Sequence, residues 1–500
     1  MSGHFADPID VATSDVHHVA AASRNAAVTD DALRELDAIL TGTSPMERIL
    51  LKAAAGAGKS YALKNLVQAA DEHLHCARIA VVAFTNKQIR PLAISLGTTL
   101  GRNKVCILAS KDADAEMPQE VRDAVYVETS TPNIPDTVTV ILATVSRLGA
   151  PNELNRLRGQ FGNGFNGSTP FDVMFVDEAW QIPHHLFDPV RRSAPVWVGV
   201  GDVGQLPPLE VGNNPWQGDE RHNPYRAWPT DYDDDPRTWT RELPAVWRPA
   251  AEHLGLWRAF YPEWESLDCV AAPGDRSVEF DSMPEGLDEI WHQVGTGVPT
   301  LLEVAGLPEP EAPDVDLPLL NVVEELLDQL FSAKVRLLGF EYDGDGEPTG
   351  EIVEQQAGGA RSDPLVAILA TRNQAVDDAA EMVERVREKH GLSDSDIISS
   401  TVDSWQGQTN GITVAIHPLN GAAELDSFNS AFGRLAVACT RATHGLLMVA
   451  RPGLDELLAQ SRARPGTPFG EPGTRQLPRQ THQRILATFA RGRIDVSDDD

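Results

Sequence analysis

The stretch "KAAAGAGKSY", residues 52–61, decides how the N-terminal half of the chain is interpreted. It follows the apolar run "RILL" (48–51) and precedes "ALKNLVQAA" (62–70), which has the spacing of an amphipathic helix. Its end matches the G-x-x-x-x-G-K-[ST] pattern, in which backbone N–H groups at a helix N-terminus surround phosphate oxygens. Ala53 replaces the first glycine of the pattern, where a small residue suffices if φ stays negative. The stretch predicts a strand, a phosphate-binding loop and a helix.

Short apolar runs alternate with helix-length amphipathic stretches on both sides of a polar connection near 209–240. This alternation is typical of parallel sheets covered by crossover helices, so the predicted fold class is α/β with two domains in series. The apolar runs are "ARIAVVAF" (77–84), "KVCILA" (104–109), "VTVILATV" (138–145), "DVMFVDEA" (172–179), "PVWVGVGD" (195–202), "PLVAILAT" (364–371), "GITVAIHPL" (411–419) and "HGLLMVA" (444–450).

The same pattern predicts where the domains begin and end. We expect a flexible N-terminal extension over 1–27, a first domain over 28–240 and a second over 241–452, with acidic insertions near 270–318 and 341–360. A tail over 453–500 would follow, which carries seven arginines between 459 and 493 against the single acid Glu471. That basic segment predicts either capture of a nucleic-acid strand or docking to an acidic protein partner.

The bulk composition narrows the classes of protein that fit. The chain has 500 residues, 42% of them apolar, and a formal net charge of −31. Long-range electrostatics would therefore repel nucleic acid, so any binding of nucleic acid requires a local basic groove. No leader pattern and no apolar run of about 18 residues occurs, which predicts a soluble, cytoplasmic protein without a membrane partner. The four cysteines are scattered without C-x-x-C spacing, so neither a disulfide framework nor a zinc site is expected.

Acidic and amide side chains follow two further apolar runs. Asp177 and Glu178 come directly after "DVMFV", where one carboxylate can hold Mg²⁺ and the other can orient a water molecule. Gln205 follows "VGVGDVG", where it is suited to sensing a γ-phosphate. Together with the loop at 52–61, these residues predict a site for a nucleoside triphosphate and Mg²⁺.

Seven segments in a fixed order resemble the superfamily 1 helicases, over roughly residues 28–452. The acid-then-"WQ" and "QLPP" features are similar to the 5′→3′ branch that includes the nonsense-mediated-decay helicase. The segments are "AAAGAGKS" (53–60), "AFTNK" (83–87), "VDEAWQ" (176–181), "GDVGQLPP" (201–208), "VWRP" (246–249), "TVDSWQGQ" (401–408) and "RLAVACTRATHGLLMV" (434–449).

The resemblance implies two tandem RecA-like P-loop NTPase domains with parallel sheets and an ATP site in the cleft between them. It implies that Glu178 is the general base, that Ser60 and Asp177 hold Mg²⁺ and that Gln205 couples the γ-phosphate to nucleic acid. It further implies that Arg248 and Arg441 reach the phosphates from the second domain. The residues implied to hold ATP are Ala55, Gly56, Ala57, Gly58, Lys59, Ser60, Tyr61, Trp247, Gln406 and Gly407.

Contacts with a single nucleic-acid strand are implied in the same way. They would be made to the backbone and the base faces, so binding would be independent of sequence. DNA is favoured over RNA, although a groove that follows the backbone serves both. The implied contact residues are Phe84, Thr85, Asn86, Thr144, Thr401 and Trp405.

The sequence departs from the family upstream of the phosphate loop. The family often carries a glutamine there that reads adenine, whereas Ala32 occupies the matching position and no glutamine precedes Gln68. We therefore expect tolerance of other bases. The leading interpretation is a strand-stimulated ATPase that moves 5′→3′. The alternatives are a nucleotide-gated switch that does not travel, and a helicase subunit of a multi-protein nuclease or defence system.

Overall fold

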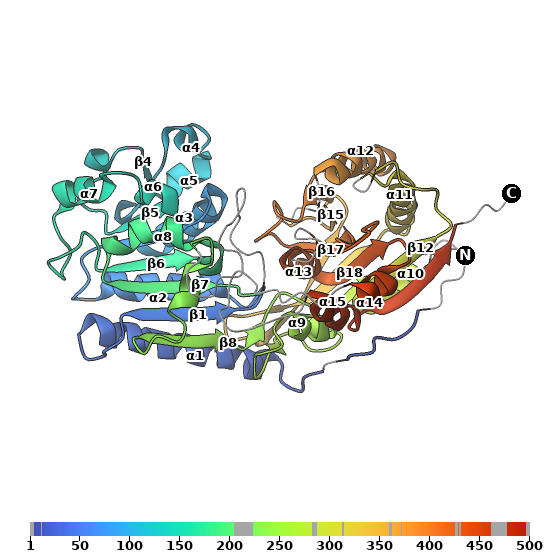
Figure 1. Ribbon diagram of the computed structural model, residues 1–500, viewed down its shortest axis with the longest axis horizontal. Coiled ribbons are helices and arrows are strands. Elements are labelled where there is room, and N and C mark those ends of the chain that lie inside the picture. The colour runs from blue at the N-terminus through green and yellow to red at the C-terminus, as the bar shows by residue number, and fades with distance from the viewer. Residues whose placement is uncertain are drawn as a thin grey trace.

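The computed structural model describes residues 5–11, 13–204, 224–282, 288–312, 315–359, 363–371, 373–425, 429, 432–461 and 478–496. Two α/β domains lie side by side, and the segments that connect them pass between the two sheets (Figure 1). Both sheets are parallel throughout the described residues. The prediction of two tandem RecA-like domains with parallel sheets is confirmed.

The first sheet has eight strands within the described part of the chain, and the strand that precedes the phosphate loop lies next to one edge. The two strands that flank this strand come much later in the sequence, because neighbouring parallel strands must be joined by a crossover connection. In spatial order the strands are β4 (Tyr126–Glu128), β3 (Val105–Leu108), β5 (Val140–Thr144), β2 (Ile79–Ala83), β6 (Val173–Asp177), β7 (Val196–Gly201), β1 (Arg48–Ala53) and β8 (Thr238–Leu243).

Helices cover both faces of this sheet, which is why its central strands consist almost entirely of apolar residues. All five residues of β2 are buried. The long helix α1 packs against α2, β8 and β1. The helices are α1 (His18–Leu40), α2 (Lys59–Glu72), α3 (Asn86–Leu100), α4 (Lys111–Ala115), α5 (Gln119–Ala124), α6 (Val145–Leu148), α7 (Glu153–Phe161) and α8 (His184–Val190).

The second sheet has six strands among the described residues. In spatial order they are β16 (Ile397–Thr401), β15 (Val366–Ala370), β17 (Asn410–Ile416), β18 (Ala442–Ala450), β12 (Thr300–Ala305) and β19 (Ala490–Asp495). The helices of this half are α9 (Leu254–Phe260), α10 (Asp288–Gly295), α11 (Leu317–Ser332), α12 (Asn373–His390), α13 (Phe432–Cys439), α14 (Leu454–Gln460) and α15 (Pro478–Leu486).

Two small sheets accompany the second domain. The antiparallel strands β11 (Arg276–Glu279), β13 (Arg336–Tyr342) and β14 (Pro348–Gln356) form a three-stranded sheet. The short strands β9 (Ala245–Val246) and β10 (Asp268–Cys269) pair in parallel where the chain leaves the first domain.

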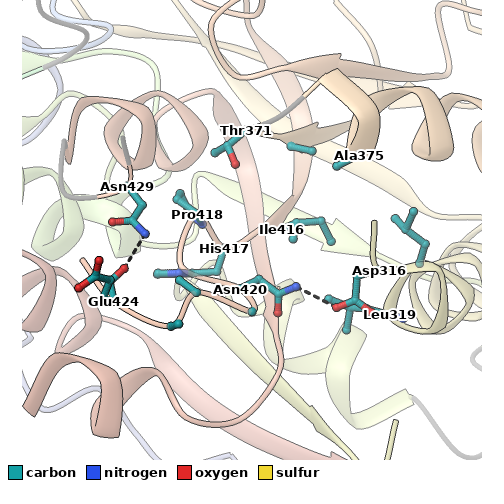
Figure 2. A pocket seen from close by; sticks show the side chains of 15 residues that line it. Asp316, Leu319, Thr371, Ala375, Ile416, His417, Pro418, Asn420, Glu424 and Asn429 are labelled. Carbon is teal, nitrogen blue, oxygen red and sulfur yellow. Dashed lines mark hydrogen bonds between the residues drawn. The ribbon is translucent and has the colours of Figure 1, made fainter. Parts of the chain in front are cut away.

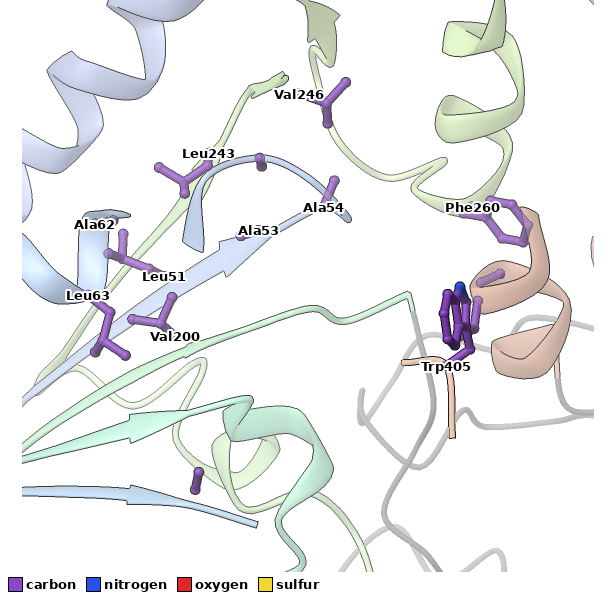
Figure 3. Close-up of a cluster of buried hydrophobic side chains, with 14 of the residues drawn as sticks. Leu51, Ala53, Ala54, Ala62, Leu63, Val200, Leu243, Val246, Phe260 and Trp405 are labelled. Carbon is purple, nitrogen blue, oxygen red and sulfur yellow. The ribbon is translucent and has the colours of Figure 1, made fainter. Parts of the chain in front are cut away.

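Ala53 is the last residue of β1, fully buried and paired with Leu243 of β8. Its φ is not positive, so a Cβ is tolerated at the entrance to the loop. Figure 3 shows Ala53 and Ala54 in the cluster with Leu51, Leu243 and Val246. The same cluster continues through Phe260 of α9 to Trp405 of the second domain. One apolar core thus joins the first sheet, α9 and the second domain.

The two end segments differ from the expectation. Helix α1 begins at His18, inside the predicted flexible extension, and Ala6 pairs with Arg491. The predicted tail contains α14, α15 and β19, and β19 pairs with β12 along the edge of the second sheet. The arginines of β19 alternate with buried residues such as Gly492 and Ile494, which is the pattern of an edge strand. Helices in the described ranges are too short or too polar to cross a bilayer.

Candidate functional site

The loop over residues 54–58, predicted to bind phosphate and called the phosphate loop below, leaves the carboxyl end of β1, near the carboxyl ends of β7 and β6. Ligands of parallel α/β sheets bind at this edge. Two glycines have positive φ, 75° at Gly56 and 91° at Gly58, where Gly58 is the N-cap of α2. A Cβ at Gly56 would also lie 2.4 Å from the Cβ of Arg248. Glycine is therefore required at Gly56 both by its backbone conformation and by the approach of the second domain's first segment.

Trp257 of α9 and Tyr261, the residue that follows the helix, hold the backbone of Ala55. The indole Nε1 of Trp257 donates to the carbonyl oxygen of Ala55 at 3.0 Å, and the amide of Ala55 donates to the hydroxyl of Tyr261 at 3.2 Å. The Tyr261 hydroxyl in turn donates to Oδ1 of Asp202 at 2.8 Å. All three side chains are buried. The loop is thus tied to the residue that follows β7.

Asn25 of α1 holds the loop from the opposite side. Its Nδ2 donates to the carbonyl oxygens of Ala57, at 2.8 Å, and of Ala245, at 2.7 Å, while Oδ1 accepts from the amide of Ala245 at 2.9 Å. The side chain is 7% exposed. Because Ala245 lies two residues before Trp247, this one amide joins the phosphate loop to the segment that carries Trp247 and Arg248.

Lys59 and Glu178 form an ion pair across the site. Nζ of Lys59 lies 2.6 Å from Oε1 of Glu178, and each side chain is 13% exposed. Burial alone would lower the pKa of Lys59, but the carboxylates of Glu178, Asp202 and Asp177 outweigh it and raise the pKa. The second carboxylate oxygen of Glu178, Oε2, is buried without a hydrogen-bond partner among the described residues. Lys59 is therefore held charged at the place where the phosphates are expected.

Burial acts on the neighbouring carboxyl groups in the opposite direction. It raises the pKa of Asp177 to about 7, and the adjacent Glu178 carboxylate adds to the effect. Burial also raises the pKa of Asp202, although Lys59 opposes the shift. A cluster of buried carboxyl groups around one lysine is a costly arrangement that a bound cation would relieve.

The turn after β6 has an unusual backbone. Glu178 has φ 49° and ψ 48°, a left-handed conformation that non-glycine residues adopt rarely. The turn packs so closely on β7 that a Cβ at Gly201 would lie 2.8 Å from the amide nitrogen of Ala179. Strained backbone of this kind persists where the surrounding structure enforces it, and such places are often functional.

Two arginines of the second half of the chain reach the same site. Arg248 donates to the carbonyl oxygen of Thr440 at 3.1 Å, and Arg441, 1% exposed, donates to the Thr440 hydroxyl at 2.8 Å. Neither forms a salt bridge with a carboxylate of the described residues. Burial lowers the pKa of Arg248 to about 9, with Arg441 contributing, and burial lowers the pKa of Arg441 as well. Two adjacent cations, Arg441 buried and Arg248 half-buried, favour a polyanionic ligand.

A cleft of about 1010 Å³ lies between the domains, lined by Lys59, Glu178, Arg248 and Arg441 among other residues. Ala57 is buried behind the loop and does not line the cleft, and Gln205 lies outside the described residues. Of the residues predicted for the nucleotide, Mg²⁺ and catalysis, the cleft brings together Ala55, Gly56, Gly58, Lys59, Ser60, Tyr61, Asp177, Glu178, Trp247, Arg248, Gln406, Gly407 and Arg441.

The structure places only some of the residues predicted to contact a nucleic-acid strand in the cleft. Phe84, Thr85 and Asn86 line the same cleft, at the N-terminus of α3. Thr85 and Thr144 use their hydroxyls as N-caps, accepting from the amides of Gln88 and Arg147.

The two second-domain candidates are engaged within the protein. The hydroxyl of Thr401 accepts from the amide of Ser404 at 3.0 Å. Trp405 is 8% exposed and its indole donates to Asn410 at 3.0 Å, so in this conformation the ring serves the core and is not available for stacking on a base.

Sequence reasoning missed Asn25, Asp202, Trp257 and Tyr261. Asp202 could have been found, because it follows an apolar run directly, as Asp177 does. The other three contact the loop through packing between segments far apart in the chain, which no local pattern records.

A second cavity, of about 240 Å³, lies at the carboxyl ends of β15 and β17 (Figure 2). Some of its polar groups already bond one another: Asn420 donates to Asp316 at 2.9 Å, and Asn429 donates to the carbonyl oxygen of Glu424 at 3.0 Å. Asp316 also accepts from Arg451 at 2.8 Å. We assign no ligand to this cavity.

Comparison with known proteins gave matches among solved structures alone. No family model and no curated protein matches the sequence. The chain is similar to the PRRSV helicase (TM-score 0.37, 13% identity, 85% of this chain and 58% of that one). It is also similar to Arterivirus nonstructural protein 10, a helicase (TM-score 0.38, 14% identity, 86% of this chain and 63% of that one). The complex of Arterivirus nonstructural protein 10 with DNA is similar as well (TM-score 0.36, 14% identity, 86% of this chain and 65% of that one). The chain thus spans less than two thirds of the length of each of these proteins. Because the TM-scores are low, the description of the fold rests on the strand order given above.

Proposed function

We propose that the chain is a superfamily 1 helicase of the 5′→3′ branch, an ATPase that requires Mg²⁺ and is stimulated by single-stranded nucleic acid. The observation that carries the proposal is the convergence of Lys59 and Glu178 with Arg248 and Arg441 across the interdomain cleft. Arginines that reach a triphosphate from a second domain make hydrolysis depend on domain closure.

The residues present fit a triphosphate with Mg²⁺. Arg248 and Arg441 form no salt bridge with a carboxylate of the described residues, the unpartnered Oε2 of Glu178 is an acceptor inside the cleft, and the two positive-φ glycines shape a concave loop. Ser60 and Asp177 supply the hydroxyl and carboxylate oxygens that Mg²⁺ prefers. Bound Mg²⁺ would neutralise charge on the phosphate oxygens.

Lys59 would change partners during the reaction. With phosphate in the loop, Nζ of Lys59 leaves Oε1 of Glu178 for a phosphate oxygen. Glu178 then loses its counter-ion and becomes a better proton acceptor for an attacking water. Arg248 and Arg441 stabilise negative charge that grows on the phosphate. The ion pair seen at 2.6 Å would therefore keep the base inactive until nucleotide binds.

Base selection would be weak in this site. Ala32 is fully buried in the core, and the amide of Asn25 is used by backbone groups. Trp247 and the 58% exposed Tyr61 offer stacking surfaces, which every base can use. We expect GTP and CTP to be hydrolysed with kcat/KM within about tenfold of ATP, since stacking discriminates far less than hydrogen bonding.

The test is steady-state hydrolysis of ATP, GTP and CTP, alone and with matched single-stranded DNA and RNA of several lengths. Strands should raise turnover, long ones more than short ones. Lys59→Ala and Arg441→Ala should each lower stimulated turnover by roughly a hundredfold or more. Lys389→Ala, an exposed lysine of α12 that does not line the cleft, is the control.

Two results would contradict the proposal. Full stimulated turnover by Arg441→Ala would exclude a catalytic cleft shared by two domains. Turnover that no strand accelerates would favour the nucleotide-gated switch. Direction is tested separately, by displacement of a bound protein block from the 5′ or the 3′ end of a strand.

A further inference from the structure

Two segments of the first domain meet beside the cleft. One is the start of α3, where the predicted strand-contact residues Phe84, Thr85 and Asn86 lie. The other is the turn after β6 that carries Asp177 and Glu178 and ends at Gln181. Since β2 and β6 are neighbouring strands, the segments that follow them emerge side by side.

A single glutamine side chain connects these segments. Oε1 of Gln88 accepts from the amide of Thr85 at 3.0 Å, and Nε2 of Gln88 donates to Oε1 of Gln181 at 2.9 Å. The amide of Gln181 donates to the carbonyl oxygen of Glu178 at 2.9 Å. A continuous path of hydrogen bonds thus runs from the backbone of Thr85 to the backbone of Glu178.

The path lies where small shifts would have consequences. Gln181 is 8% exposed, and hydrogen bonds in such surroundings are stronger than in water. Glu178, at the far end, has the left-handed backbone described above. A displacement of Phe84, Thr85 and Asn86 would therefore be transmitted to a strained turn that has few alternative conformations.

Helix capping accounts for only half of this arrangement. The capping box of α3 requires Oε1 of Gln88 and the hydroxyl of Thr85. It makes no use of Nε2, which is the atom directed at Gln181. A glutamate at this position would cap the helix equally well, so the contact with Gln181 calls for a separate explanation.

We propose that Gln88 and Gln181 are positioning residues that form a relay between the strand-contact loop and the catalytic turn. The relay rests on the proposed function, because it is the route by which a bound strand accelerates hydrolysis. Strand contact at 84–87 fixes Thr85, Gln88 follows the amide of Thr85, and Gln181 sets the orientation of Glu178 toward the water. Both glutamines line the cleft, and the proposal gives neither of them a contact with the nucleotide.

The test compares three variants with the unaltered protein. Gln181→Met breaks the relay and leaves the capping box intact. Gln88→Met removes both the relay and the capping box. Gln88→Glu keeps the capping box, and its carboxylate can accept a hydrogen bond from the side-chain amide of Gln181 once that amide group rotates. Each is measured for hydrolysis without and with a long single strand, for strand Kd by fluorescence anisotropy, and for its thermal unfolding midpoint.

Gln181→Met should lower strand-stimulated turnover by about five- to tenfold, while unstimulated turnover and strand Kd change by less than about twofold. Gln88→Met should lose the same stimulation and also unfold at a lower temperature. Gln88→Glu should retain stimulation.

The relay is overturned if Gln181→Met is stimulated like the unaltered protein, or if stimulated and unstimulated turnover fall equally, which would indicate a purely structural role. If Gln181→Met lowers the thermal unfolding midpoint, the comparison of strand-stimulated turnover between Gln88→Glu and Gln88→Met decides whether the relay exists. Failure of the proposed function looks different, because the unaltered protein would then respond to no strand.

Discussion

Asn25 illustrates how one buried amide can organise a site. Its three hydrogen bonds go to backbone groups of Ala57 and Ala245, so the side chain substitutes for secondary structure between segments that share none. Removing it would leave a buried donor and two buried acceptors without partners.

We predict that Asn25→Ala lowers the free energy of unfolding by about 2–4 kcal/mol, and that it raises KM for ATP because the loop loses its anchor. Urea unfolding followed by tryptophan fluorescence and steady-state kinetics measure the two effects. Ser23→Ala, on an exposed position of the same helix, is the control. An unchanged KM would show that the loop keeps its shape without the amide.

His253 determines part of the response to acid. The ring is fully buried, stacked on Trp257 at 5.9 Å between centroids, and both of its nitrogens lack partners among the described residues. Burial, with Arg276 adding repulsion, lowers the pKa of His253 from 6.5 to about 3. The unfolded chain therefore binds a proton as pH falls below 6.5, whereas the folded protein does not until about pH 3.

Neutral His253 therefore makes its full contribution to the free energy of unfolding above pH 6.5, and this contribution is lost as the pH falls toward 3. The loss is at most about 1.4 kcal/mol per pH unit. Burial also lowers the pKa of His417 to about 3, with the same sign. We predict that His253→Phe reduces the loss of stability between pH 6.5 and 5, leaving the share of His417. Urea midpoints across this range provide the measurement, and an unaltered pH slope would contradict the assignment.

At the scale of single elements, α9 connects more of the site than any motif does. Its Trp257 and the following Tyr261 hold Ala55, Tyr261 reaches Asp202, and Arg484 of α15 donates to the carbonyl oxygen of Ala259 at 2.9 Å. The helix therefore lies between the phosphate loop and the C-terminal part of the second domain.

We predict that Tyr261→Phe raises KM for ATP by about three- to tenfold with a smaller effect on kcat, because the amide of Ala55 and the carboxyl of Asp202 each lose a hydrogen bond. Steady-state kinetics test this. Tyr232→Phe is the matched control, since the hydroxyl of Tyr232 meets Arg191 and no part of the loop. Equal KM values for both variants would remove α9 from the account of nucleotide binding.

The sequence predicts correctly those residues whose position depends on the pattern of their own segment. Lys59 and Asp177 lie where the strand–loop–helix rhythm placed them, because each follows a buried apolar strand. Trp405 was predicted to meet a strand and proves buried, since the burial of an aromatic ring depends on packing partners that its own segment does not reveal. Tyr261 was overlooked for the same reason.

At the scale of the whole molecule, the N-terminal residues 5–11 and 13–17 link the two domains (Figure 1). Ala6 pairs with Arg491, the amide of Asp10 donates to the carbonyl oxygen of Ala487 at 2.9 Å, and Ser14 donates to Asp268 at 2.7 Å. The chain then enters α1, which covers the first sheet. The segment therefore opposes separation of the domains.

We predict that deleting residues 1–13 increases amide hydrogen exchange in β19 and makes the two domains unfold at different temperatures. Deleting residues 1–4, which leaves Ala6 in place, should change neither. Hydrogen-exchange mass spectrometry and calorimetry provide the readouts. Equal exchange in β19 for the two deletions would show that the Ala6 pairing contributes little.

The position of β19 has a consequence for how the protein is made. β19 completes the second sheet beside β12, yet it is translated after every other described strand of that sheet. From the moment β18 has paired with β12, the other side of β12 presents unbonded N–H and C=O groups until Ala490–Asp495 leaves the ribosome. At about 5–20 residues per second, that interval lasts several seconds. The nascent chain is therefore most vulnerable to strand-to-strand aggregation between the pairing of β18 with β12 and the arrival of β19, and chaperone capture during that interval would decide the yield.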